Sequence, residues 1–444
     1  MKRKPWILCC LALLLTLAAN GLWLTVVTGW KWLPAAGAAA FLVSQVYTAY
    51  PKDLSNRLRV CLHGLVRLQS FCLALPLTLI LHVAAGVLLL PKQWPAFLWS
   101  AGLAALTLTI NFWNGILSVY AASVQLGIRR RFLGLLCGMI PIVNLFALSR
   151  ILHVVSEEIR FEAEKDRIDR ERRNQRICAT RYPLLLVHGV FFRDYRYVNY
   201  WGRIPSALEK NGATIFYGNH QSAASVADSA RELTERIKKI VEETGCEKVN
   251  IVAHSKGGLD CRYALSFCGA APYVASLTTI NSPHQGCGFA DYLLTAIPEK
   301  AQQKIERTYN AAMRRLGDPS PDFMAAVRDL TAARCAQRCR ELEEHPHTEG
   351  ILCQSVGSCL RRGGDGRFPL NLTYRLVKFF DGENDGLVSR DSFPFGERFT
   401  YLQSGGYRGI SHGDVVDLNR ENLPDFDVRE FYVTLVSQLK DRGL

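Results

Sequence analysis

The chain has 444 residues, 49% of them hydrophobic, and a formal net charge of +13. Residues 1–150 carry 13 of the 53 lysines and arginines but only one acid, Asp53, so nearly all of the excess positive charge lies there. A nucleic-acid-binding protein would need basic residues clustered on a folded domain. Here they lie between long apolar segments, which argues against a nucleic-acid partner.

Residues 1–150 contain four apolar segments without a charged residue. All but the second approach the ~20 residues that a helix needs to cross the hydrocarbon core of a membrane. The segments are 6–27, 35–50, 70–90 and 97–122. A cleaved signal peptide is a poor explanation, because the first segment lacks a clear small-residue cleavage site and further segments follow. We expect a membrane domain of at least four helices.

The distribution of lysine and arginine predicts the orientation of this domain. With the N-terminus inside, ten basic residues are cytoplasmic and only Lys31 and Lys92 lie outside. A fifth apolar segment, residues 132–148, contains Pro141 and is either another span or a hairpin within the membrane. The many basic residues after it favour the hairpin. We therefore expect an integral protein of the cell membrane with its C-terminal domain in the cytoplasm.

Residues 151–177 are dense in charges of both signs and predict a solvated helical linker. From residue 182 onward, short β-like runs alternate with helical patterns. This texture is typical of an α/β domain with a mostly parallel sheet flanked by helices. The sequence thus predicts a membrane domain over 1–150, a linker over 151–177 and an α/β domain over 178–444.

One serine lies at an abrupt junction in the α/β domain. Residues 248–253, KVNIVA, predict a buried strand, residues 257–268 predict a helix, and Ser255 lies between them. A serine on such a turn is strained and exposes its hydroxyl beside the helix N-terminus. The turn crowds the positions two before and two after the serine, and Ala253 and Gly257 are both small. A glycine-rich helix start without catalytic function is the alternative.

Two backbone N–H groups are expected beside this serine. Residues 184–190, LLLVHGV, predict a second strand that ends at His188 and Gly189. The N–H groups of Val190 and of Lys256, the residue after the serine, are the expected donors to the oxyanion of a tetrahedral intermediate.

An acid and a histidine follow in the order found in α/β-hydrolases. Residues 376–389 predict a strand followed by an acidic turn that contains Asp385, and His412 is the last histidine of the chain. In the order Ser255, Asp385, His412, the histidine would take the serine proton and the carboxylate would fix the imidazole tautomer. Asp381 could take the same role, but the Asn-Asp-Gly setting favours Asp385.

Five segments together resemble the true lipases of bacteria, which belong to the α/β-hydrolase superfamily. The segments are LLLVHGV (184–190), EKVNIVAHSKGGLDCRYA (247–264), LTTINSPHQGCGFAD (277–291), ENDGLVS (383–389) and ISHGDVVDL (410–418). The resemblance spans about residues 180–430. It implies esterase or lipase activity on acylglycerols or related lipid esters. The polytopic N-terminal region, in place of an export signal, departs from the family.

Three further histidines are expected to support the site. We expect His188 to order the oxyanion loop, and His254 to be structural with its ring directed away from the serine hydroxyl. His284 either braces the site or caps a strand.

The resemblance also implies a structural calcium ion near the catalytic histidine. Asp414 matches one carboxylate ligand and Asp365 is a candidate for a second; ordinary surface aspartates are the alternative. Calcium favours such oxygen ligands. The chemistry itself needs no cofactor, and the spacing of Cys335, Cys339, Cys353 and Cys359 is not that of common zinc sites.

A helical insertion over about residues 290–360 is either a lid over the acyl pocket or an ordinary cap. Together these features predict a membrane-anchored serine esterase or lipase that hydrolyses carboxylic esters of lipids through an acyl-enzyme. A phospholipase or a lipid acyltransferase could use the same triad. A membrane scaffold with an inactive hydrolase domain is the alternative of another class, and the oligomeric state stays open.

Overall fold

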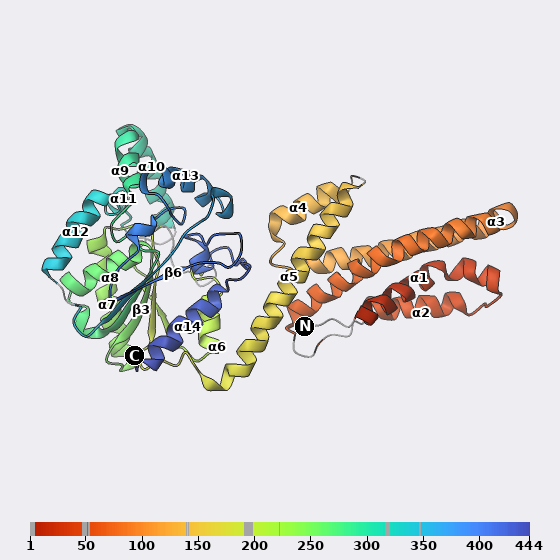
Figure 1. The fold of residues 1–444 in the computed structure, drawn as a ribbon, viewed down its shortest axis with the longest axis horizontal. Coiled ribbons are helices and arrows are strands. Elements are labelled where there is room, and N and C mark those ends of the chain that lie inside the picture. The colour runs from red at the N-terminus through yellow and green to blue at the C-terminus, as the bar shows by residue number, and fades with distance from the viewer. Residues whose placement is uncertain are drawn as a thin grey trace. The chain divides into compact units, whose positions relative to one another are not determined.

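The computed structural model divides the chain into two compact units, Met1–Glu171 and Arg172–Leu444 (Figure 1). The structure describes residues 5–46, 51, 54–138, 140, 142–190, 199–221, 223–315, 320–345 and 348–444.

The described residues of the first unit form helices and the turns that join them. Its helices are α1 (Pro5–Thr28), α2 (Leu33–Val46), α3 (Asn56–Ala122), α4 (Gly127–Gly138) and α5 (Val143–Arg172). Helix α3 breaks at Gln93, whose φ of −142° and ψ of 48° are not helical, so it contains two of the predicted membrane segments. Those two halves fold back on each other where Gly64 and Gly115 allow close approach (Figure 1).

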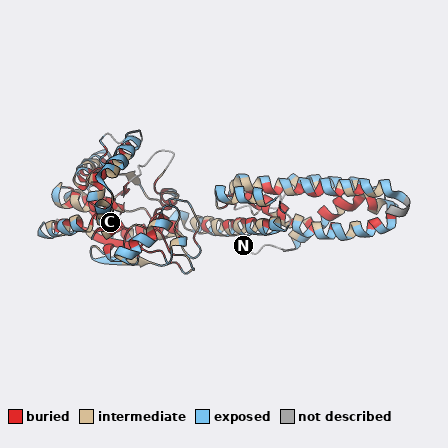
Figure 2. Ribbon diagram, turned by 90° about the horizontal axis from the view of Figure 1, so that it is seen from above, coloured by how far each residue is buried: buried red, intermediate tan, exposed pale blue. Residues whose placement is uncertain are grey.

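Three helical stretches of this unit are long and apolar enough to cross a membrane. They are Trp6–Thr28, Asn56–Leu89 and Gln93–Ala122. The short predicted segment 35–50 forms α2, which has 14 residues, and its predicted end at 47–50 lies outside the described residues. Pro141 of the fifth apolar segment also lies outside them. The outward sides of the helices are exposed (Figure 2) and carry large apolar side chains such as Leu79, Ile80, Val83 and Val87. Such a surface suits lipid rather than water.

The charged linker is helical to Arg172 but is not fully solvated as expected. Glu158 on α5 is buried and accepts hydrogen bonds from the Ser123 hydroxyl and the Val124 backbone N–H. Arg57 forms an ion pair with the same carboxylate. The expectation was wrong for this stretch because buried Val155 and Ile159 give α5 an apolar side that packs in the unit's core.

The second unit is built on a parallel six-stranded sheet with the order β2-β1-β3-β4-β5-β6. The strands are β1 (Leu184–Val187), β2 (Ile215–Tyr217), β3 (Val249–His254), β4 (Val274–Ile280), β5 (Leu352–Ser358) and β6 (Arg398–Leu402). Helices α6 (Ile204–Lys210) and α14 (Val428–Asp441) cover one face, and α7 (Val226–Thr244) and α8 (Lys256–Phe267) cover the other (Figure 1). Burial on both faces explains the continuous apolar strands. The predicted fold class is confirmed.

The helical insertion between β4 and β5 contains α9 (Gly288–Ala296), α10 (Glu299–Arg315), α11 (Phe323–Arg328) and α12 (Ala332–Glu344). The predicted end near residue 360 was too late, because residues 352–358 form β5 inside the sheet. The strand predicted at the start of 376–389 was also wrong. That stretch belongs to helix α13 (Leu370–Asp381), whose buried residues Leu370, Tyr374 and Val377 follow helical spacing.

Candidate active site

Ser255 lies on a strained turn between β3 and α8. Its φ of 56° and ψ of −131° place it in a conformation that side-chain-bearing residues rarely adopt. The Ser255 N–H donates to the carbonyl of Ile280 at the end of β4, with a distance of 3.0 Å. The sheet order reverses between β1 and β3, and the carboxyl ends of strands at such a point are the usual ligand site of open α/β sheets. The serine stands at that point.

Small residues surround the turn because larger ones would collide with it. A Cβ atom added at Gly257 would lie 2.5 Å from the carbonyl oxygen of His188, and one added at Gly189 would lie 2.7 Å from the Cβ of Ser255. Ala253 is fully buried on β3 opposite Val187 of β1. The close packing accounts for the row of small residues around the serine.

The two expected oxyanion donors come from neighbouring parallel strands. Val190 follows β1 and Lys256 opens α8 after β3. Gly189, just before Val190, packs directly against Ser255. The next described residue after Val190 is Asn199. The register thus brings both chain segments to the same edge of the sheet, beside the serine.

His412 and Asp385 are joined by a short hydrogen bond, 2.6 Å from Nδ1 to Oδ2, and both side chains are buried. The other carboxylate oxygen accepts from the N–H groups of Leu387 and Val388 at 2.9 and 2.8 Å. The amide of Asn281 donates to Oδ2 at 2.7 Å. The hydrogen bond from the imidazole to Oδ2 places a ring proton on Nδ1 and leaves Nε2 as the acceptor.

His254 connects this pair to the serine turn. Its ring centroid lies 4.4 Å from that of His412, and its Nδ1 is 2.5 Å from the hydroxyl of Tyr200. Burial, together with the nearby His412, lowers the pKa of His254 well below its ordinary value, so it stays neutral. Because His254 directly precedes Ser255, the three members of the predicted triad converge on one region.

Asp381, the competing acid, lies elsewhere. Its carboxylate accepts from the N–H groups of Gly288 and Phe289 at 3.0 and 3.1 Å, at the first turn of α9. This is a typical arrangement for a helix N-terminus. The carboxylate that reaches His412 is that of Asp385.

His284 is held between β4 and α8. Arg262 donates to its Nδ1 at 3.1 Å, so Nε2 carries the proton toward the hydroxyl of Thr279 at 3.0 Å. Burial and the charge of Arg262 lower its pKa well below the ordinary value. The ring is thus held in one orientation by side chains of two elements, which suits the expected bracing role; the alternative of a strand cap stays open.

The sequence reasoning missed a buried polar cluster behind the serine turn. The Lys256 ammonium donates to Asp260 at 2.7 Å and to the Ser229 hydroxyl at 3.0 Å. His220 lies 3.6 Å from the same aspartate and stacks on His188, whose Nδ1 is 2.9 Å from the Gly189 carbonyl oxygen. The spacing i, i+4 of Lys256 and Asp260 on a helix was the available signal.

That cluster contains an aspartate with a raised pKa. Burial raises the pKa of Asp260 to about 6, although Lys256 acts in the opposite direction. The side chain of Lys256 is only 1% exposed and so lies inside the domain, while its backbone N–H opens the helix beside Ser255.

The two candidate calcium ligands are both buried and both engaged by protein donors. Asp414 accepts from Arg408 and Ser411, whereas Asp365 accepts from Arg362 and from the Gly409 N–H. Among the residues that the structure describes, no group of three or more histidine, cysteine or acidic side chains is placed to hold a metal ion.

Comparison with known proteins gives the family of the chain. A family model described as palmitoyl protein thioesterase matches residues 183–320. The triacylglycerol lipase of Pseudomonas fragi is 34% identical over 296 residues, which cover 60% of this chain and 98% of that protein. The chain belongs to the triacylglycerol lipase family.

Other relatives match over shorter stretches. The triacylglycerol lipase of Pseudarthrobacter phenanthrenivorans is 34% identical over 171 residues, 36% of this chain and 53% of that protein. The chain spans about half the length of this relative and of the similar lipase of Burkholderia plantarii, of which it covers 47%. The solved Staphylococcus hyicus lipase has 16% identity and a TM-score of 0.46, over 59% of this chain and 97% of the lipase.

Proposed function

We propose that the chain is a membrane-anchored serine hydrolase that cleaves carboxylic esters of lipids through an acyl-enzyme. The observation that carries this proposal is the convergence of a strained serine, a buried histidine and an aspartate hydrogen-bonded to that histidine. Membership of the triacylglycerol lipase family supports the same reaction class.

In the proposed mechanism, Nε2 of His412 takes the proton of the Ser255 hydroxyl while the oxygen attacks the ester carbonyl. The resulting oxyanion accepts hydrogen bonds from the N–H groups of Val190 and Lys256. His412 returns the proton to the departing alcohol, and the acyl group remains on the serine. Water then attacks the acyl-enzyme with the same histidine as base, releasing the fatty acid. Asp385 stabilises the imidazolium throughout.

A lipid substrate is supported by the apolar surface next to the acid loop. Leu372, Leu376 and Phe379 on α13 are exposed, with Phe379 at 81% relative exposure. The same helix donates a hydrogen bond from the Thr373 hydroxyl to the carbonyl of Gly386, one residue after Asp385. An apolar surface this close to the site suits acyl chains or a lipid surface better than a soluble polar ester.

The test is covalent labelling of the full-length protein in membranes with a fluorophosphonate probe, which reacts with an activated serine. We expect labelling of the wild type and none of Ser255→Ala. Hydrolysis of medium- and long-chain acylglycerols should be lost in parallel. An unlabelled wild type would contradict the proposal and would favour the non-catalytic scaffold.

A thioester is a second candidate substrate, because the matching family model describes a palmitoyl protein thioesterase. The same serine and oxyanion donors could cleave either bond. Parallel assays of a palmitoyl glycerol ester and a palmitoyl thioester of equal chain length would separate the two. Phospholipids and an added alcohol acceptor would extend the test to phospholipase and acyltransferase activity.

For location, we propose that the hydrolase unit faces the cytoplasm. The excess of lysine and arginine in the loops assigned to the inside supports this orientation. The test places one cysteine at exposed Asn174, on a background without the native cysteines, and treats intact cells with an impermeant thiol reagent. Labelling only after permeabilisation is expected; labelling of intact cells would place the active site outside.

A further inference from the structure

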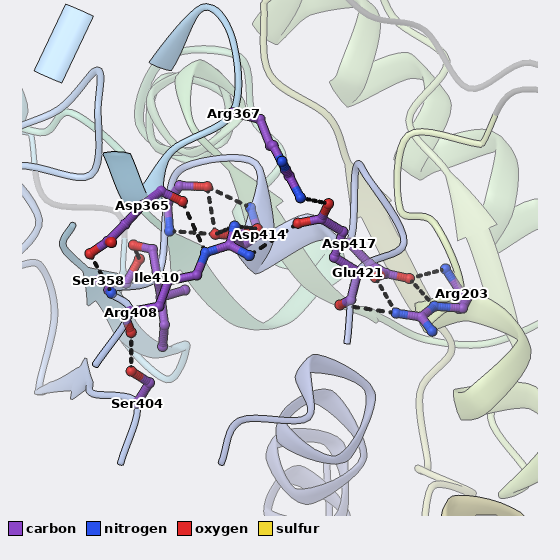
Figure 3. A network of polar contacts seen from close by, with 12 residues as sticks. Arg203, Ser358, Asp365, Arg367, Ser404, Arg408, Ile410, Asp414, Asp417 and Glu421 are labelled. Carbon is purple, nitrogen blue, oxygen red and sulfur yellow. Dashed lines mark hydrogen bonds and ion pairs between the residues drawn. The ribbon is translucent and has the colours of Figure 1, made fainter. Parts of the chain in front are cut away.

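The loop that follows His412 is held by an arginine inside the domain. The Arg408 guanidinium contacts both carboxylate oxygens of Asp414 at 3.1 Å (Figure 3). The same carboxylate accepts from the N–H and the hydroxyl of Ser411, the residue just before His412, at 2.9 and 2.7 Å. One carboxylate therefore links Arg408 to the backbone on both sides of the histidine.

Arg408 also reaches two other segments. Its Nε donates to the carbonyl oxygen of Asp365 at 2.9 Å, and its Nη1 donates to Glu421 at 3.0 Å (Figure 3). The guanidinium is thus surrounded by oxygens from two carboxylates and one backbone carbonyl. Oxygens of these kinds are the ones that a calcium ion takes as ligands.

The residues do not fit a calcium ion in addition to this arginine. Calcium takes six to eight oxygens at about 2.3–2.6 Å, whereas the Asp414 carboxylate is already shared between Arg408 and Ser411. The Asp365 carboxylate is engaged in other directions, by Arg362 Nε and the Gly409 N–H, each at 3.0 Å. A second cation at Asp414 would also lie beside a positive charge that is only partly exposed.

We propose that the Arg408 guanidinium takes the place of the structural calcium ion and positions the His412 loop without any metal. This positioning role rests on the catalytic function proposed for His412. A guanidinium is always charged and presents its N–H groups in a fixed plane, so it can bridge several oxygens as an ion does.

Two more arginines extend the same arrangement along the loop. Arg203 forms a bidentate pair with Asp417, with both distances at 2.8 Å, and Arg367 pairs with Glu421 (Figure 3).

The first experiment compares the purified full-length protein in detergent with EGTA and with millimolar Ca²⁺. We expect the same thermal unfolding midpoint and the same ester hydrolysis in both, and no heat of binding in a calorimetric titration with Ca²⁺. A midpoint that falls in EGTA and recovers with Ca²⁺ would overturn the proposal. The midpoint and the titration remain informative even if no esterase activity is found, so the two proposals can fail separately.

The second experiment removes the internal cation. Arg408→Ala should lower kcat by about ten- to a hundredfold, as expected when a group that orients a functional side chain is lost, with KM nearly unchanged. Added guanidinium ion should restore part of the activity, which a general loss of packing would not allow. Arg362→Ala is the matched control, because that arginine contacts the same residue through the Asp365 carboxylate but is largely exposed.

Full activity of Arg408→Ala, or an equal loss in Arg362→Ala, would contradict the positioning role. If Arg408→Ala does not fold, Arg408→Lys provides the test: it keeps a cation but cannot bridge three segments, and it should retain the fold with an intermediate kcat. A lysine variant with wild-type kcat would contradict the need for the planar group.

Discussion

The serine turn and the histidine loop are held in place by different forces. Ser255 is fixed by packing: its positive φ is enforced by tight contacts that leave no room for a side chain at Gly257 or Gly189. His412 is fixed by hydrogen bonds and charge, through Asp385 on its ring and the Asp414–Arg408 pair beside it. Volume changes should therefore damage the turn, whereas changes of charge should damage the loop.

Neutralisation of Asp385 should cause the largest loss of activity, and it changes the charge beside His412 without changing the size of the side chain. Asp385→Asn keeps the size of the side chain but removes the charge that orients and stabilises the imidazolium. We expect kcat to fall by about 10⁴-fold. Steady-state hydrolysis of a soluble ester would measure it.

Asp381→Asn is the matched control for that change. It replaces one of the two oxygens that accept at the first turn of α9 by an amide NH₂ group and removes the negative charge there. It should cost about 0.3–1 kcal/mol of stability while it leaves kcat nearly intact. The reverse result, a large loss of kcat in Asp381→Asn with an active Asp385→Asn, would show that the acid has been assigned to the wrong residue.

The Lys256–Asp260 pair is a buried charge pair next to the serine turn. Both side chains are only 1% exposed, so Lys256→Met would leave a buried carboxylate without its cation. We expect a loss of about 3–5 kcal/mol in the unfolding free energy of the hydrolase unit. The double variant Lys256→Met/Asp260→Leu should recover most of it, because an apolar pair needs no compensation. Denaturant unfolding of the full chain would check both.

The same pair predicts a pH dependence. Folding raises the pKa of Asp260 from 3.8 to about 6, so between these values the folded state binds more protons than the unfolded state. The contribution of this group to stability is present at low pH and is lost as pH rises through about 6. The unfolding free energy of the double variant minus that of the wild type should therefore increase as the pH rises from roughly 4 to 7. A constant difference over that range would contradict the shift.

The two regions also differ in how far the sequence predicts them. The strained turn at Ser255 is predictable from local sequence, because the small residues Ala253 and Gly257 lie two positions before and after the serine. The positive φ of Ser255 agrees with that prediction. The histidine loop depends on partners far apart in the chain. Arg203 and Asp417, for example, are 214 residues apart, and no local pattern marks such a pair.

Residues 376–380 were wrongly predicted as a strand because a short apolar run does not by itself show helical periodicity. Residues 376–380, LVKFF, resemble a strand when taken alone. The preceding Leu370 and Tyr374 complete an i, i+4, i+7 pattern with Val377 that predicts a helix. In the first unit, by contrast, the α3 break at Gln93 lies between the predicted apolar segments 70–90 and 97–122, as the gap in the apolar pattern indicates.

The smallest effect is expected at Ala253, where only volume changes. This residue is fully buried on β3 two residues before the serine, and valine would add two methyl groups to a space already filled by Val187 and its neighbours. Overpacking of this kind costs about 1–3 kcal/mol, and the strained turn should shift with it, so both the unfolding midpoint and kcat should fall. Ala253→Gly, which adds no volume, should retain most of the activity. A fully active and equally stable valine variant would show that the turn is not held by packing, and the contrast with the histidine loop would be lost.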